Sequence, residues 1–92
     1  CEVGGGRTGV ADPAAAVALA RRIADLAPML EFAGIQAYCG AIQAIPDYAE
    51  RTAAAAQVAA RARGYVTALR ESGLPPAIVS GGGTGTFDID PA

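Results

Sequence analysis

The sequence has 92 residues, of which 52% are hydrophobic and 17% are charged, and its formal net charge is −2. This length allows one domain at most, and the composition is apolar enough for a folded core. The negative net charge disfavours a polyphosphate partner, so we expect no nucleic-acid binding. There is no apolar run of the roughly 20 residues that a membrane span needs and no signal-peptide pattern, so we expect no membrane association and a cytoplasmic location.

Several residue types that carry chemistry are missing. The seven basic residues are all Arg, and there is no His or Lys. The commonest general base is therefore absent, and no side chain here can form a Schiff base. Cys1 and Cys39 lack a metal-ligand spacing and are too few for a disulfide framework, and we expect Cys39 to pack as a small hydrophobic residue. Because the chain begins at Cys1 and ends at Ala92 just after a glycine motif, we expect a fragment of a longer protein.

The first 28 residues predict a short strand, a glycine loop and a helix. Residues 1–3 are typical of a strand that runs into glycines. Asp12-Pro13 begins the helix, because Asp accepts hydrogen bonds from free N–H groups of the first turn and Pro has no N–H to leave unpaired. Pro28 ends it. Apolar residues at helical spacing predict one buried face: Ala16, Leu19, Ala20, Ile23, Leu26 and Ala27.

The remaining residues predict a strand, a longer helix and a final strand. Residues 30–40 form the strand, with Ile35, Ala37 and Cys39 on one face and Gln36 and Tyr38 on the other. The second helix begins at Pro46-Asp47 and ends near Ser72, where Gly73 favours a left-handed stop. Its apolar stripe contains Val58, Ala62, Tyr65, Val66 and Leu69. Residues 76–80 predict a short buried strand.

The order strand-helix-strand-helix-strand indicates an α/β fold with parallel strands and helical crossovers. Three strands leave two open sheet edges, so we expect the isolated chain to be poorly stable and prone to association.

Two glycine-rich segments follow predicted strands. Gly4–Gly9 matches the G-x-G-x-x-G pattern of dinucleotide-binding loops. In that motif the helix begins within the glycines, whereas Asp12-Pro13 delays it here. Nucleotide binding, a plain glycine turn and a loop of some other site are all compatible with this segment. Residues 80–86 are the stronger signal, because consecutive glycines with flanking hydroxyls expose N–H groups that suit a phosphate; a plain loop is the alternative.

Three segments together resemble the family of D-threonine aldolases and D-serine dehydratases. They are residues 2–10 (EVGGGRTGV), 34–40 (GIQAYCG) and 79–87 (VSGGGTGTF). The resemblance spans nearly the whole chain. It implies a partial TIM-like (β/α) barrel of the alanine-racemase type, in which residues 1–92 form a central segment of the domain that binds pyridoxal 5′-phosphate (PLP).

The resemblance also implies roles for individual residues. Arg7 matches the Arg that hydrogen-bonds the phenolic oxygen of PLP, and Tyr38 matches the residue whose ring lies against the pyridine. Gln36 shares the face of Tyr38. Matches to the phosphate site are Ser80, Gly81 and Gly82, with Thr84 as a further candidate.

For the parent protein, the resemblance implies a lyase that acts on β-hydroxy D-amino acids by retro-aldol cleavage or by elimination of water. A lysine before Cys1 would hold PLP, a divalent metal would be bound by residues after Ala92, and the enzyme would be a homo-oligomer. The 92 residues alone are expected to be inactive.

The chain departs from the family pattern at two places. Cys39 stands where the family often has His, and residues 42–44 lack a His that commonly follows the Gln. These departures leave the substrate open.

Two other functions are also kept open: a non-catalytic PLP-binding barrel protein, which would keep the phosphate loop without a metal site, and a small nucleotide-binding domain that uses the first glycine motif.

Overall fold

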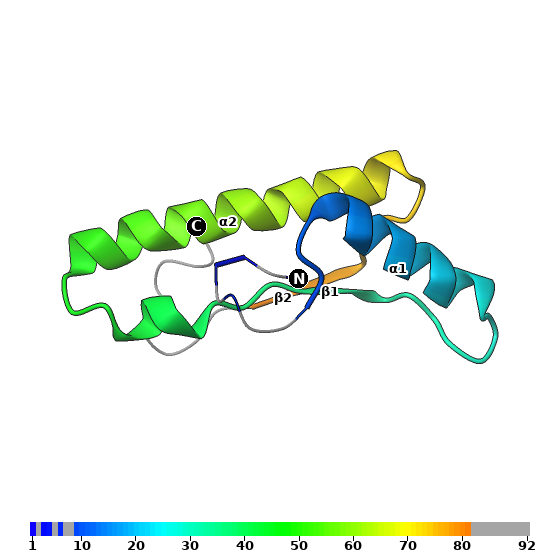
Figure 1. The fold of residues 1–92 in the computed structure, drawn as a ribbon, viewed down its shortest axis with the longest axis horizontal. Helices are drawn as coiled ribbons and strands as arrows, with labels where there is room; N and C mark the ends of the chain where they lie inside the picture. The colour runs from blue at the N-terminus through cyan, green and yellow to red at the C-terminus, as the bar shows by residue number, and fades with distance from the viewer. Residues whose placement is uncertain (2, 5, 7–8, 82–92) are drawn as a thin grey trace.

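The computed structural model describes residues 1, 3–4, 6 and 9–81, with the backbone alone at 43 and 44. Its elements follow the order α1 (Pro13–Asp25), β1 (Gly34–Gln36), the short 3-10 helix η1 (Gly40–Ala44), α2 (Tyr48–Glu71) and β2 (Ile78–Ser80). Figure 1 shows both helices on the same side of the two strands. The described chain is therefore a mixed α/β structure, as predicted.

Both helices begin at the predicted aspartates. The Asp12 carboxylate accepts a hydrogen bond of 2.8 Å from Ala15 N, and Pro13 is the first residue of α1. The Asp47 carboxylate accepts a bond of 2.8 Å from Ala49 N at the start of α2. Beyond the end of α2, Gly73 has a φ of 76°, the left-handed conformation that glycine adopts at lowest cost.

The two strands form a parallel sheet joined by η1 and α2. Gly34 pairs with Ile78, Ile35 with Val79 and Gln36 with Ser80. A Cβ on Gly34 would collide with the carbonyl of Ile78, so glycine at this position permits the close approach of the strands.

The core lies between the helices and one face of β1 with its extension. Its buried members include Val3, Ala16, Ala37, Cys39, Ile42, Ala55 and Tyr65. The predicted alternation is confirmed, because Ala37 and Cys39 are 8% and 5% exposed whereas Gln36 and Tyr38 are exposed. Cys39 packs as a small hydrophobic side chain, as expected.

Several predictions of strand structure are wrong in extent or burial. Cys1 and Val3 are not in a strand, and the strand predicted over residues 30–40 is limited to residues 34–36, because its pairing is with the three residues of β2. The turn into α2 forms η1, which the sequence analysis did not predict.

The last strand, predicted to be buried, is exposed throughout, with Ile78 59% and Val79 53% exposed. The core cluster of the described residues includes none of its side chains, because the buried side chains opposite the helices come from Val3 and from Ala37 and Cys39. Leu19 on α1 and Leu26, the residue that caps its C-terminus, are also exposed despite their position in the predicted apolar stripe.

Candidate functional site

The candidate site lies where β1 and β2 end. Ala37 N donates a hydrogen bond of 2.7 Å to Ser80 O, so the chain after β1 continues beside the end of β2. Since the strands are parallel, their carboxyl ends lie at the same edge of the sheet, the usual position of ligand sites in α/β folds.

The N-terminal segment runs along the other edge of β1. Successive residues of a strand direct their backbone groups to alternate edges, and Ala37 N is directed to β2. Gln36 O therefore faces the opposite edge, where it accepts a hydrogen bond of 2.8 Å from the amino group of Cys1. The position of a Cβ on Gly4 is 3.5 Å from Cys39 Sγ. From Cys1 to Gly4 the chain thus advances in the same direction as from Gln36 to Cys39, and Gly4, where the first glycine motif starts, lies beside the end of β1.

Figure 1 shows that the helices lie on one side of the two strands. Three candidate residues lie on the opposite face, away from the buried Ala37 and Cys39. Gln36 and Ser80 are register partners on neighbouring parallel strands, so their side chains lie on the same face. Both are exposed, and Tyr38, two residues beyond Gln36, is 41% exposed. The structure therefore brings an amide, a phenol ring and a hydroxyl to one accessible surface.

The backbone at Gly81 lies against the continuation of β1. A Cβ on Gly81 would collide with the carbonyl oxygen of Ala37. Glycine is therefore required for the chain after Ser80 to pass this close to β1. This approach fixes where the second glycine-rich segment begins, next to Ala37 and Tyr38.

The Tyr38 ring lies against the first residue of η1. The position of a Cβ on Gly40 is 3.5 Å from Tyr38 Oη and 3.7 Å from its Cζ, both ordinary van der Waals separations. The ring and the start of η1 are therefore in direct proximity. The proximity of Tyr38 to Gly40 was not predicted, because residues 30–40 were expected to form one continuous strand.

The other predicted site residues, Arg7, Gly82 and Thr84, lie outside the described residues. Within the described ranges, no three His, Cys, Asp or Glu side chains are grouped as metal ligands would be.

A hydrogen bond that the sequence analysis did not predict ties the first glycine segment to α2. Tyr65 Oη donates a bond of 3.0 Å to Val10 O, just after Gly9. Tyr65 is 2% exposed, and a buried tyrosine hydroxyl usually has a partner. That rule could have indicated a polar contact for Tyr65, although not its identity.

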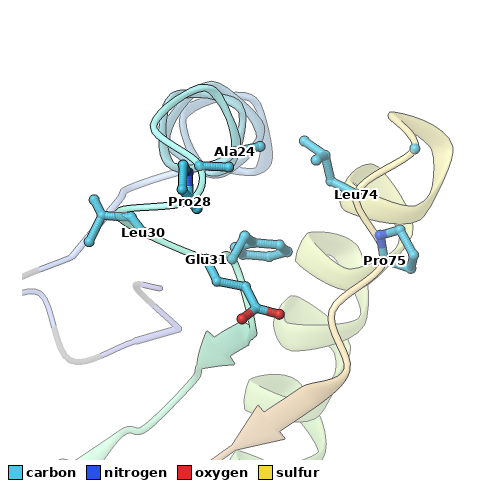
Figure 2. A pocket seen from close by; sticks show the side chains of 9 residues that line it. Ala24, Pro28, Leu30, Glu31, Leu74 and Pro75 are labelled. Atoms are coloured by element: carbon cyan, nitrogen blue, oxygen red, sulfur yellow. The ribbon is translucent and has the colours of Figure 1, made fainter.

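A pocket with a volume of about 470 Å³ lies at the other end of the sheet (Figure 2). Its lining includes Glu31 and Phe32, which precede β1, and Leu74 and Pro75, which precede β2. It is therefore formed before the amino ends of the strands, away from Gln36, Tyr38 and Ser80.

Fold and site together define an α/β segment in which Gln36, Tyr38 and Ser80 lie at the carboxyl edge of two parallel strands, beside Gly81, where the second glycine motif begins. None of the helices in the described part of the chain combines the length and hydropathy that a bilayer crossing requires. No family model matches the sequence.

Known proteins similar to this chain are aldolases. It is 44% identical over 91 residues to a D-threonine aldolase from Arthrobacter sp, an alignment covering 99% of this chain and 24% of that protein. It is 43% identical over 86 residues to a 3-hydroxy-D-aspartate aldolase from Paracoccus denitrificans (strain Pd 1222), covering 94% of this chain and 22% of that protein.

A solved structure supports the same relation. The crystal structure of D-threonine aldolase from Filomicrobium marinum matches 97% of this chain with a TM-score of 0.90 and 41% identity, over 24% of that chain. The predicted resemblance to D-threonine aldolases is thus confirmed. The chain spans about a quarter of the length of these relatives.

Proposed function

We propose that residues 1–92 are a central segment of a TIM-like barrel in a PLP-dependent lyase that cleaves β-hydroxy D-amino acids. The arrangement of residues 1–4, β1 and β2 supports this proposal most directly. These segments lie side by side, run in the same direction and lead to glycine motifs at one edge. Neighbouring parallel segments whose carboxyl ends carry the site are what a (β/α) barrel requires. The relatives named as aldolases support the reaction class.

The described residues fit PLP at this edge. Ser80 offers a hydroxyl, and Gly81 offers a backbone N–H at a position where any side chain would collide with the continuation of β1. A hydroxyl next to an N–H that no side chain covers suits a phosphate group. Tyr38 has an accessible ring that can lie flat against a pyridine, and Gln36 offers amide groups on the same face. Gly82 and Thr84 would extend the phosphate site, and Arg7 would hydrogen-bond the phenolic oxygen.

The part played by these side chains is binding and orientation. When bound, PLP withdraws electrons from the α-carbon of an amino acid while a bond at or beside that carbon breaks. Ser80 and Gly81 would anchor the phosphate end, and Tyr38 would restrict rotation of the ring. A guanidinium at Arg7 would keep a negative charge on the phenolic oxygen, because Arg stays protonated at any working pH. The lysine that holds PLP and the ligands of a divalent metal would come from other parts of the protein.

The nucleotide-binding alternative is disfavoured by the start of α1. A dinucleotide fingerprint places helix N–H groups on the pyrophosphate. Here α1 begins at Pro13, four residues after Gly9, and the Asp12 carboxylate occupies its N-terminus through the bond from Ala15 N. A carboxylate at this position would repel a phosphate group.

The test uses the full-length protein that contains this segment. With PLP bound, D-threonine or 3-hydroxy-D-aspartate should give glycine and an aldehyde, as the Cα–Cβ bond breaks, the hydroxyl proton leaves and Cα gains a proton. The L-enantiomers serve as controls. Ser80→Ala should raise the dissociation constant of PLP about fivefold, the worth of one hydrogen bond, whereas the exposed Thr67→Ala on α2 should not.

Each other outcome has a defined meaning. PLP binding without turnover of any D-amino acid would favour the non-catalytic barrel protein. Release of ammonia and an oxo acid would assign elimination of water in place of cleavage. Tight dinucleotide binding without PLP binding would refute the proposal.

A further inference from the structure

Arg51 differs from the other arginines of α2. Arg61, Arg63 and Arg70 are exposed, whereas Arg51 is half-buried. Its Nη1 donates a hydrogen bond of 2.8 Å to Ile45 O, and its guanidinium carbon is 5.2 Å from the centre of the Tyr48 ring. Its Nε is shielded from solvent and has no hydrogen-bond partner among the described residues. A shielded donor without an acceptor costs free energy, which the bond to Ile45 O and the contact with the Tyr48 ring must offset.

Arg51 holds the far end of η1. Ile45 caps η1 at its C-terminus, and Arg51 lies in the first turn of α2, so the bond closes the connection between the two helices. A 3-10 helix this short has poor hydrogen-bond geometry of its own and depends on outside contacts. The guanidinium provides one, while burial of Ile42 in the core provides another.

The near end of η1 lies beside the Tyr38 ring. A Cβ built on Gly40, its first residue, would be 3.5 Å from Tyr38 Oη and 3.7 Å from Tyr38 Cζ, so the ring lies beside the backbone at the start of η1. Tyr38 is on the uncovered face and 41% exposed, so few groups surround its ring. The position of η1 is therefore one of the factors that determine where the ring can lie. A displacement of η1 would therefore reach the ring directly.

We propose that Arg51 is a positioning residue, which fixes η1 through Ile45 O and thereby sets the orientation of the Tyr38 ring in the PLP site. This inference rests on the proposed function. Arg51 itself would not touch PLP, since its guanidinium contacts Ile45 O and the Tyr48 ring.

The test compares variants of the full-length protein by PLP titration and by visible circular dichroism of the bound cofactor. Arg51→Met keeps the side-chain stem but removes the donors, and should raise the dissociation constant about tenfold and weaken the dichroic band. Arg51→Lys should restore binding to within about threefold of wild type, because an ammonium can still donate to Ile45 O. Arg63→Met, at an exposed site on the same helix, is the matched control and should bind PLP like wild type.

A double-mutant cycle separates positioning from a general structural role. If Arg51 acts through Tyr38, Arg51→Met should change the dissociation constant less than about twofold in a Tyr38→Ala background. An equal loss in both backgrounds would overturn the inference, as would wild-type affinity in Arg51→Met. If Arg51→Met does not fold, Arg51→Gln takes its place with the same two outcomes. Failure of the wild-type protein to bind PLP would instead refute the proposed function, and this inference with it.

Discussion

The hydroxyl of Tyr65 joins the middle of α2 to the segment that follows the first glycine motif. Between the buried Val3 and the bonded Val10 lie Gly4, Gly6 and Gly9, all with positive φ. Glycines in such conformations give a segment little stiffness of its own. The bond from Tyr65 Oη to Val10 O therefore fixes the chain just after Gly9 to α2.

Tyr65→Phe should lower the free energy of unfolding of the full-length protein by about 1 kcal/mol. The ring would stay packed in the core, so the loss reports the hydroxyl and not a cavity. Urea titration measures the change, and Tyr38→Phe, at a residue 41% exposed, is the control with little expected effect on stability. Equal stability of wild type and Tyr65→Phe would show that water replaces the bond to Val10 at no cost.

For single residues, the face of the strand on which a side chain lies can be predicted from the sequence, whereas its contacts cannot. Alternation alone places Gln36 and Tyr38 opposite Ala37 and Cys39, and the structure agrees. The approach of Gly81 to Ala37 and of Tyr38 to Gly40 cannot be predicted in this way, because each depends on strand register and on a turn that brings separate residues together. Arg7, Gly82 and Thr84 stay predictions.

Among the elements, the helices are predicted well and the strands less well. Asp12, Asp47 and Gly73 act through hydrogen bonds or φ angles within a few residues of the helix ends, so local sequence determines those ends. Strand length depends on pairing between segments distant in sequence. The pairing of β1 with β2 joins residues more than 40 positions apart, and no local pattern specifies its extent. The burial predicted for β2 is wrong for a related reason, because it depends on what covers the strand.

Within α2, Gly64 offers a stabilising substitution. It lies in the helix interior, it is exposed, and a Cβ at this position would meet nothing within 4 Å. Gly64→Ala should therefore raise the free energy of unfolding by about 0.5–1 kcal/mol, because alanine loses less backbone entropy on entering a helix.

Gly73→Ala is the opposite control for this prediction. Its φ of 76° is left-handed, so alanine should cost about 1 kcal/mol there. Urea titration of the full-length protein measures both changes. A loss of stability in Gly64→Ala would show that the structure of α2 near this residue is not a regular solvated helix.

For the whole molecule, shape and surface argue against independent stability. The radius of gyration is 14.0 Å, against about 12 Å for a compact domain of this length. The solvent-accessible surface is 5936 Å², against about 4900 Å² for a compact protein of 9.1 kDa. Many of the buried apolar side chains are small, including Ala16, Ala20, Ala37 and Ala55. Ile78 and Val79 on β2 are exposed. Such exposure is expected of a strand that normally packs within a larger sheet.

We therefore predict that the isolated 92-residue chain does not unfold as a cooperative monomer. Among the described residues β2 pairs with β1 alone. An exposed apolar strand with an open edge favours pairing with another copy, and closure of a barrel would remove such an edge. Sedimentation of the purified chain should show concentration-dependent association, and thermal unfolding followed by circular dichroism should be broad. The full-length protein is the control and should unfold sharply. A sharp transition of a monomeric 92-residue chain would mean that these helices and strands form a self-sufficient domain, and the proposed place of the segment within a barrel would lose its physical basis.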